Sequence, residues 1–287
     1  MKKFVQLVGV LIILVAGFFA YQFAVNQLRP PRAFLKVTST PQAEVFLDGE
    51  SLGKTPLQKK NLRVGSRNFV LKAEVRTFDA GGENKTKTLE FKQKIDLQPS
   101  AVTAVNYEFA PSKEFSSGEV LSLGSGSGIA IVTNPENSKV SLGGKDIGTS
   151  PLSQIVDPGV AKLNISKEGY ITREVGVNVE IGFRLSAWVS LAKNPYPQTK
   201  KLETKGKYLL TDLSSNSLSL SSDYPKWVEA IWYFQDTQKS VPKKFDLLID
   251  KNGKTYTLNT DYKKNKEINV GYLSDSPGKL TDKAQVA

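Results

Sequence analysis

The sequence predicts an all-β protein, made of tandem small antiparallel β-sandwiches behind one N-terminal transmembrane helix. Three observations predict this. An uncharged segment lies near the amino terminus, two long stretches of the chain repeat one another, and apolar residues alternate with polar ones at the period of two typical of half-buried strands. The length of 287 residues allows two or three small domains behind a targeting segment.

The composition excludes several classes of site. The chain has no Cys and no His, so it lacks the usual ligands of zinc, haem and iron–sulfur centres and the Cys or Ser–His pairs of nucleophilic enzymes. We expect no cofactor, no metal site and no catalytic residue. Lys and Arg number 39 against 28 Asp and Glu, a net charge of +11. This charge favours a solvated surface over a polyanion-binding one, and nucleic acid is not an expected partner.

Residues 1–28 are predicted to form a transmembrane signal-anchor helix. Phe4 to Val25 contains no charge, and as a helix this segment would be about 33 Å long, enough to cross a hydrocarbon core of about 30 Å. Lys2 and Lys3 precede it and no small-residue cleavage site follows, which favours an uncleaved anchor over an export signal. A short basic head normally stays in the cytoplasm. The sequence therefore predicts a single-pass protein of the cell membrane with the bulk of the chain extracytoplasmic.

The two repeated stretches predict two copies of one sandwich, at residues 34–110 and 129–193. In the first copy, Ala43, Val45 and Leu47 alternate with residues that point to the other face of the predicted strand. Asp48 then begins a turn. We interpret Asp48 as a turn former that bonds its own backbone, in preference to a ligand. Turn residues recur at matching positions of the two copies: Asp48, Gly49, Gly53 and Pro56 in the first, and Gly144, Gly148 and Pro151 in the second.

At these positions the chain resembles the PEGA domain family. The matching residues are Thr40-Pro41, Ala43, Val45, Asp48-Gly49, Gly53 and Thr55-Pro56-Leu57 in the first copy, and Asn134-Pro135, Val140, Gly144, Gly148, Ser150-Pro151-Leu152 and Lys167-Glu168-Gly169-Tyr170 in the second. The first copy lacks the Gly-Tyr tail. The resemblance implies a small β-sandwich found in repeats on envelope and surface proteins, acting as a binding or spacer module, and it implies no catalytic residue.

The remaining segments are predicted to be two linkers, a third module and a tail. Residues 111–128 are rich in Ser and Gly and are expected to be a flexible joint, and residues 194–206 combine two prolines with several lysines. Residues 207–273 are expected to be a third β-rich module, and 274–287 a disordered tail. Within the module, the Asn252-Gly253 turn predicts a hairpin, and Ser222 or Asp223 followed by Pro225 predicts the start of a helix.

Two groups of side chains are candidates for binding a partner. Trp188 shares the polar face of its predicted strand with Arg184, so it is expected either to contact a partner or glycan or to pack against a neighbouring module. In the predicted helix, Trp227 lies on the apolar face, whereas Trp232 and Tyr233 fall outside it. These two rings can stack on sugars or contact a protein, although packing in a core is the favoured interpretation.

The motifs examined for chemistry do not support an enzyme. Ser-x-x-Lys occurs four times, about as often as chance allows, without the partner motifs of penicillin-binding enzymes. We therefore expect a membrane-anchored, non-catalytic binding or spacer protein whose candidate partners are cell-wall polymer, carbohydrate or a surface protein. An accessory or sensor subunit of an envelope complex is the main alternative, and a hydrolase in the C-terminal module is the remaining one.

Overall fold

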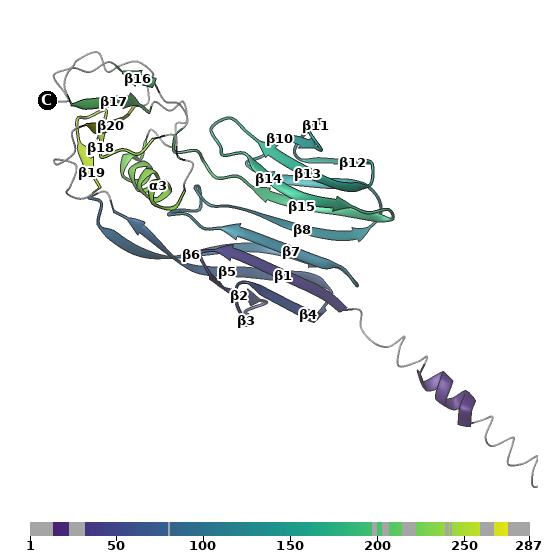
Figure 1. Ribbon diagram of the computed structural model, residues 1–287. Coiled ribbons are helices and arrows are strands. Elements are labelled where there is room, and N and C mark those ends of the chain that lie inside the picture. The colour runs from purple at the N-terminus through teal and green to yellow at the C-terminus, as the bar shows by residue number, and fades with distance from the viewer. Residues whose placement is uncertain are drawn as a thin grey trace, which may run out of the picture.

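The computed structural model describes residues 14–22, 32–79, 81–196, 200–202, 207–213, 222–238, 241, 243–258 and 267–274. Most of these residues are in β-strands, which form two sandwiches and a smaller unit that contains one helix (Figure 1). The predicted tail lies outside the described residues except for Ser274.

The first repeat is a sandwich of seven strands. They are β1 (Arg32–Thr40), β2 (Ala43–Leu47), β3 (Glu50–Lys54), β4 (Leu57–Arg63), β5 (Gly65–Phe78), β6 (Asn84–Leu97) and β7 (Val102–Glu108). One sheet has the order β3-β2-β5-β6, and β4, β1 and β7 are neighbours in the other. Alternate side chains point between the two sheets, so that Val45, Leu71 and Val105 are buried in a common core.

The second repeat has the same arrangement. Its strands are β9 (Ile129–Asn134), β10 (Lys139–Leu142), β11 (Lys145–Thr149), β12 (Leu152–Gln154), β13 (Gly159–Ser166), β14 (Arg173–Val179) and β15 (Phe183–Ser190). The order β11-β10-β13-β14 repeats that of the first sheet, and β12, β9 and β15 are neighbours in the other. Ile131, Val140 and Leu163 are completely buried between them.

The turn residues take the same backbone conformations in both repeats. Positive φ occurs at Asp48 (49°), Gly49 (88°) and Gly53 (113°), and at Gly143 (58°), Gly144 (83°) and Gly148 (122°). The peptide bonds before Pro41 and Pro56 are cis, as are those before the matching Pro135 and Pro151. Asp48 accepts a hydrogen bond from the Asn68 amide at 2.9 Å, so its carboxylate joins the β2–β3 turn to β5.

The sandwiches are not wholly antiparallel, in contrast to the prediction. β1 pairs in parallel with β7, and β9 pairs in parallel with β15. In each repeat the first and last strands are neighbours in one sheet, while the chain between them crosses to the opposite sheet twice and adds β4 or β12 to the first sheet in between. Since it returns in the direction in which it started, the closing pair is parallel.

The Ser/Gly segment differs from its predicted role as a flexible linker, because it contains strand β8 (Ser117–Ser125). β8 pairs antiparallel with β7 of the first repeat and with β15 of the second. The result is one seven-stranded sheet, β12-β9-β15-β8-β7-β1-β4, that runs through both sandwiches (Figure 1). The two repeats are therefore joined by backbone hydrogen bonds and not by a free joint.

The third module is a mixed sheet with one helix packed on it. Its elements are β16 (Lys200–Leu202), β17 (Tyr208–Asp212), α3 (Tyr224–Thr237), β18 (Leu247–Asp250), β19 (Thr255–Thr257) and β20 (Ile268–Leu273), with sheet order β16-β17-β20-β18-β19. Asp223 is the N-cap of α3, and its carboxylate accepts from the Lys226 amide at 3.2 Å. β18 and β19 form the antiparallel hairpin, whereas β20 runs parallel to β17 and β18.

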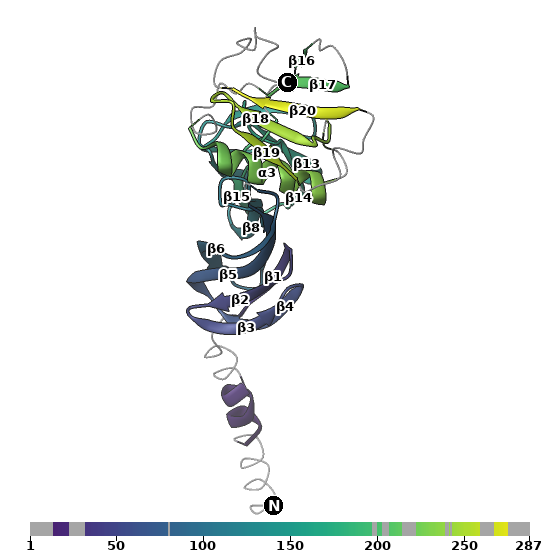
Figure 2. The ribbon, with the colours of Figure 1, turned by 90° about the vertical axis from the view of Figure 1, so that its left-hand side faces the viewer.

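The third module shares its core with the first repeat. Phe78 at the end of β5 and Phe115 just before β8 belong to the same buried cluster as Trp227 and Phe234 of α3. Part of the predicted linker 194–206 also packs here, because Tyr196 is buried in this cluster. Figure 2 shows the third module at the end of the sandwiches opposite the amino-terminal segment.

Residues 14–22 are helical and precede the first repeat. Over the parts of the chain that the structure describes, no helix has both the length and the apolar character needed to cross a membrane.

Candidate functional site

A cleft of about 460 Å³ lies where the two repeats and α3 meet. Its walls come from the ends of β1 and β7, the beginning of β8, the beginning of β14 and the last turns of α3. The residues that line it are Thr40, Asn106, Glu108, Phe109, Ala110, Phe115, Ser117, Glu119, Ile171, Thr172, Arg173, Glu174, Ala192, Tyr233, Phe234, Thr237 and Gln238. All three modules therefore contribute to a single concave site.

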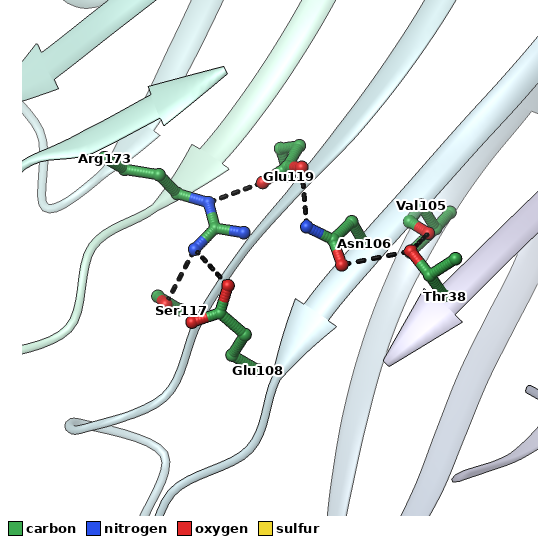
Figure 3. A network of polar contacts seen from close by, with 7 residues as sticks. All are labelled: Thr38, Val105, Asn106, Glu108, Ser117, Glu119 and Arg173. Carbon is green, nitrogen blue, oxygen red and sulfur yellow. Dashed lines mark hydrogen bonds and ion pairs between the residues drawn. The ribbon is translucent and has the colours of Figure 1, made fainter. Parts of the chain in front are cut away.

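Arg173 is the charged centre of the cleft (Figure 3). Its Nε donates to Glu119 Oε2, and its Nη1 donates to Ser117 Oγ at 2.9 Å and to Glu108 Oε1 at 3.3 Å. The side chains of Arg173 and Glu119 are each only 11% exposed, whereas that of Glu108 is 53% exposed. The ion pair between Arg173 and Glu119 is thus largely removed from water. Loss of either side chain would leave the other charge buried without a partner.

The network continues across the seven-stranded sheet to its third strand. Asn106 of β7 donates to the other carboxylate oxygen of Glu119 at 2.9 Å, and Thr38 of β1 donates to the Asn106 side-chain carbonyl at 3.0 Å (Figure 3). Both oxygens of Glu119 therefore have donors. A second hollow of about 290 Å³, lined by Lys36, Thr38, Asn106 and Glu119 among others, adjoins this row.

The cleft combines acidic groups with an aromatic wall. Glu108 and Glu119 contact the Arg173 guanidinium, and Glu174, which also lines the cleft, pairs with Lys162. These five groups carry a formal excess of one negative charge, so a cationic or hydroxyl-rich ligand is favoured over an anion. Tyr233 donates from its hydroxyl to the Phe109 carbonyl at 2.7 Å. Burial raises the pKa of this phenol, and burial likewise raises the pKa of the neighbouring Tyr107 to about 12, so both rings are neutral at physiological pH.

The most buried carboxylate of the cleft, that of Glu119, is held on both oxygens: Arg173 donates to one and Asn106 to the other. Within the described ranges, no group of three or more acidic side chains lies close enough to hold a metal ion.

Of the predicted binding residues, Trp188 and Arg184 lie on β15. Trp188 is half-buried, and its ring centroid is 5.5 Å from that of Phe91 in β6, so the indole packs against the core of the first repeat. This is the packing alternative of the sequence interpretation. Arg184 donates to Ser153 of β12, on the same sheet as Trp188 but separate from the cleft.

The structure does not support the three aromatic residues of α3 as an exposed surface. Trp227 and Trp232 are both 0% exposed, because the sheet of the third module covers one side of the helix and the first repeat covers the other. Tyr233 is half-buried and lines the cleft, where its ring contributes to the wall. Helical periodicity cannot reveal this burial, since the second covering surface comes from a distant part of the chain.

Sequence reasoning did not identify Arg173, Glu119, Glu108 or Glu229. Glu229 on α3 accepts from Thr77 Oγ1 at 2.7 Å and pairs with Lys87, so it joins the third module to the β5–β6 hairpin. Glu119 lies within the segment predicted to be a linker, where a lone acidic residue looks solvated. The sequence offered one signal for Glu119: it directly precedes the largely apolar segment Val120 to Leu123, which is typical of a strand.

Comparison with known proteins agrees with this repeat structure. Residues 33–76 and 127–193 match the PEGA domain family. Both repeats are therefore PEGA-like, and they are called the first and second PEGA domains below. No curated protein and no solved structure matched the chain in the corresponding comparisons.

The first PEGA domain is longer than its matched segment. The match ends at Arg76 within β5, although β6 and β7 complete the sandwich. β5 and β6 have 14 residues each, compared with 8 and 7 in the corresponding β13 and β14 of the second PEGA domain. The extra length forms an arm whose end contacts α3, and this arm distinguishes the first domain from the second.

Proposed function

We propose that the chain is a membrane-anchored, extracytoplasmic, non-catalytic spacer that holds its third module at a fixed distance from the membrane for a partner in the cell envelope. The observation that carries the proposal is the seven-stranded sheet, which unites both PEGA domains through β8. A tandem array with free joints would allow each domain to reorient, whereas a shared sheet does not.

The contacts beyond the sheet support the same function. The ion pair between Arg173 and Glu119 joins the second PEGA domain to β8, and Glu229 joins α3 to the arm of the first. Apolar packing of Phe78 and Phe115 against α3 adds to these polar contacts. The third module is therefore fixed to the sandwiches by an interface with its own core, as expected for a rigid connection.

Membrane anchoring rests on the sequence of residues 4–25, which contains no charged residue. The proposed orientation places the PEGA domains outside the cytoplasm, which agrees with the envelope location that this family suggests. The cleft is the proposed contact site for a hydroxyl-rich polymer or a basic segment of a surface protein. The accessory-subunit alternative loses its main support, because Trp227 and Trp232 are buried.

Fractionation and proteolysis test the proposal. The full chain expressed in a bacterial host should sediment with the membranes and resist extraction by high salt, and protease added to intact spheroplasts should digest it. Deletion of residues 1–28 should move it to the soluble fraction. The point variant Leu14→Arg should act in the same direction as the deletion, because a charge at the centre of a spanning helix costs about 3 kcal/mol. A full-length chain that is soluble without detergent would refute the anchor.

A further inference from the structure

The end of the molecule at which the amino-terminal segment enters exposes an unusual set of apolar side chains. Ile155, Val160 and Ile181 are 81%, 87% and 84% exposed, and Phe183 is 42% exposed. They lie in the β12–β13 and β14–β15 connections or beside them, and an open hollow of about 590 Å³ adjoins Ile155. We call these four residues the apolar tip. Large aliphatic side chains exposed to this extent in one place indicate a contact surface.

The strand register places the apolar tip at the same end of the sheet as Arg32, the first residue of β1. Phe34 pairs with Val102, Ala104 with Leu121, and Ser125 with Phe183. The starts of β1, β7 and β15 and the end of β8 therefore lie at the same end of the sheet. Three strand spacings separate β1 from β15, which is about 14 Å. The connection that carries Ile155 follows β12, whose Gln154 pairs with Ile129 at this same end.

The chain length between the apolar segment and Arg32 brings this end close to a bilayer. Six residues, 26–31, separate Val25 from Arg32, so the seven steps between these two residues span about 24 Å when fully extended. A membrane helix at residues 4–25 would therefore keep Arg32 within that distance of the lipid surface. In Figure 1 the connection between β14 and β15, which carries Ile181, lies at the same end of the molecule as the start of β1.

Charge at this end is also compatible with lipid headgroups. Arg32 and Arg63 are cross-strand partners at the ends of β1 and β4, and both are exposed. Two like charges opposite one another destabilise a strand pair, and anionic phosphates at a membrane surface would offset this repulsion. Asp157 and Glu180, beside the apolar tip, are exposed and can remain at the level of the headgroups.

We propose that the apolar tip of the second PEGA domain inserts into the interfacial region of the bilayer and forms a second attachment beside the anchor. This inference rests on the proposed membrane anchoring. Two attachments about 14 Å apart on one sheet would fix the tilt of the whole molecule, whereas a single helix followed by a short spacer would leave it free to swing. Burial of exposed aliphatic side chains in the acyl boundary is the driving force.

Site-directed fluorescence in the full chain tests the inference, because the chain has no native Cys. Val160→Cys and Ile181→Cys are labelled with a polarity-sensitive dye and reconstituted into vesicles of phosphatidylcholine and phosphatidylglycerol. Glu168→Cys is the matched control, since it is exposed at the opposite end of the same domain. The labels at 160 and 181 should shift to shorter emission wavelengths and lose at least half of their intensity with doxyl-labelled lipids. The label at 168 should do neither.

The outcomes separate the two proposals. If the protein does not float with the vesicles, the anchor itself is wrong. If it floats while the labels at 160 and 181 behave like the one at 168, the anchor stands and the inference about the apolar tip is overturned. A blue shift without quenching by doxyl lipids would mean that protein, not lipid, covers the tip, and this too would overturn it.

Discussion

Arg173 begins strand β14 of the second PEGA domain, yet the groups that its guanidinium binds belong to β7 and β8. Its pairing with Glu119 has the features of a buried ion pair, since both side chains are 11% exposed. Both charges of such a pair lose their hydration when the chain folds. If one partner is removed, the other charge stays buried without an opposite charge beside it. Arg173 is therefore a side-chain link between the repeats that acts beside the backbone hydrogen bonds of β8.

Arg173→Met should lower the free energy of unfolding by about 3 kcal/mol, because Glu119 would remain buried without its cation. The measurement is urea unfolding of the chain that lacks residues 1–28. Lys162→Ala is the matched control in the same domain, where the Lys162–Glu174 pair is 70% and 52% exposed. It should leave the free energy of unfolding nearly unchanged, because the pair is exposed to water. Equal effects of the two substitutions would show that Arg173 is not a critical link.

The two buried indoles of α3 allow a second comparison between residues. Trp227 donates from Nε1 to the buried carbonyl of Pro195 at 2.7 Å, whereas Trp232 Nε1 has no hydrogen-bond partner among the described residues. Both Trp→Phe substitutions remove a similar volume. Only Trp227→Phe leaves a buried carbonyl, that of Pro195, without its hydrogen-bond donor. It should destabilise by about 1–3 kcal/mol more than Trp232→Phe in thermal and urea unfolding. The reverse order would contradict this assignment of the hydrogen bond.

Strand β8 shows why part of the fold could not be predicted from the local sequence. The strands of the repeats were identified because one buried face imposes a period of two, and α3 was identified from Asp223 and Pro225 at its start. The Gly and Ser content of β8 indicated flexibility instead. In the structure, Gly118 lies so close to β7 that a Cβ atom would be 2.4 Å from Tyr107 Cδ2. A glycine that suggests flexibility in the sequence is thus required at position 118 by close packing, a long-range feature that the local sequence does not contain.

The glycines of β8 therefore make a test of the shared sheet. Gly118→Ala would place its methyl group 2.6 Å from the Asn106 carbonyl, so β7 and β8 would have to separate, at a cost of about 2 kcal/mol. Gly124→Ala in the same strand meets nothing closer than Gln98 Cδ at 3.8 Å. It should be neutral or stabilising by up to about 1 kcal/mol. Loss of stability in both variants would indicate that neither glycine position of β8 tolerates a side chain, independent of the contact with β7.

At the scale of the whole molecule, the sequence predicted the modules but not their union. The family resemblance and the hairpin signals indicated three units, and the residues that join them lie in segments that looked like linkers or loops. Lys87 and Glu229 are separated by 142 positions, and neither has a pattern that indicates the other. The rigidity that the proposed spacer function requires would therefore come from the contacts between modules.

Distance measurements between modules test that rigidity directly. Spin labels at Lys94→Cys in the first PEGA domain and Lys244→Cys in the third module, both exposed, should give one narrow distance distribution in pulsed electron paramagnetic resonance. Glu229→Ala should broaden it, because Thr77 and Lys87 would lose their shared acceptor while the apolar contacts of Phe78 and Phe115 remain.

Asp236→Ala is the matched control for this measurement, because Asp236 is exposed on the same helix. It should leave the distribution narrow, since removal of a solvated charge at this position breaks no contact between modules. A distribution that is already broad in the unmodified chain would contradict the spacer proposal itself. Broadening by Asp236→Ala as much as by Glu229→Ala would instead place the effect in the helix and not in the interface. Only the combination of a narrow starting distribution and a selective response to Glu229 supports a rigid connection that a single buried carboxylate maintains.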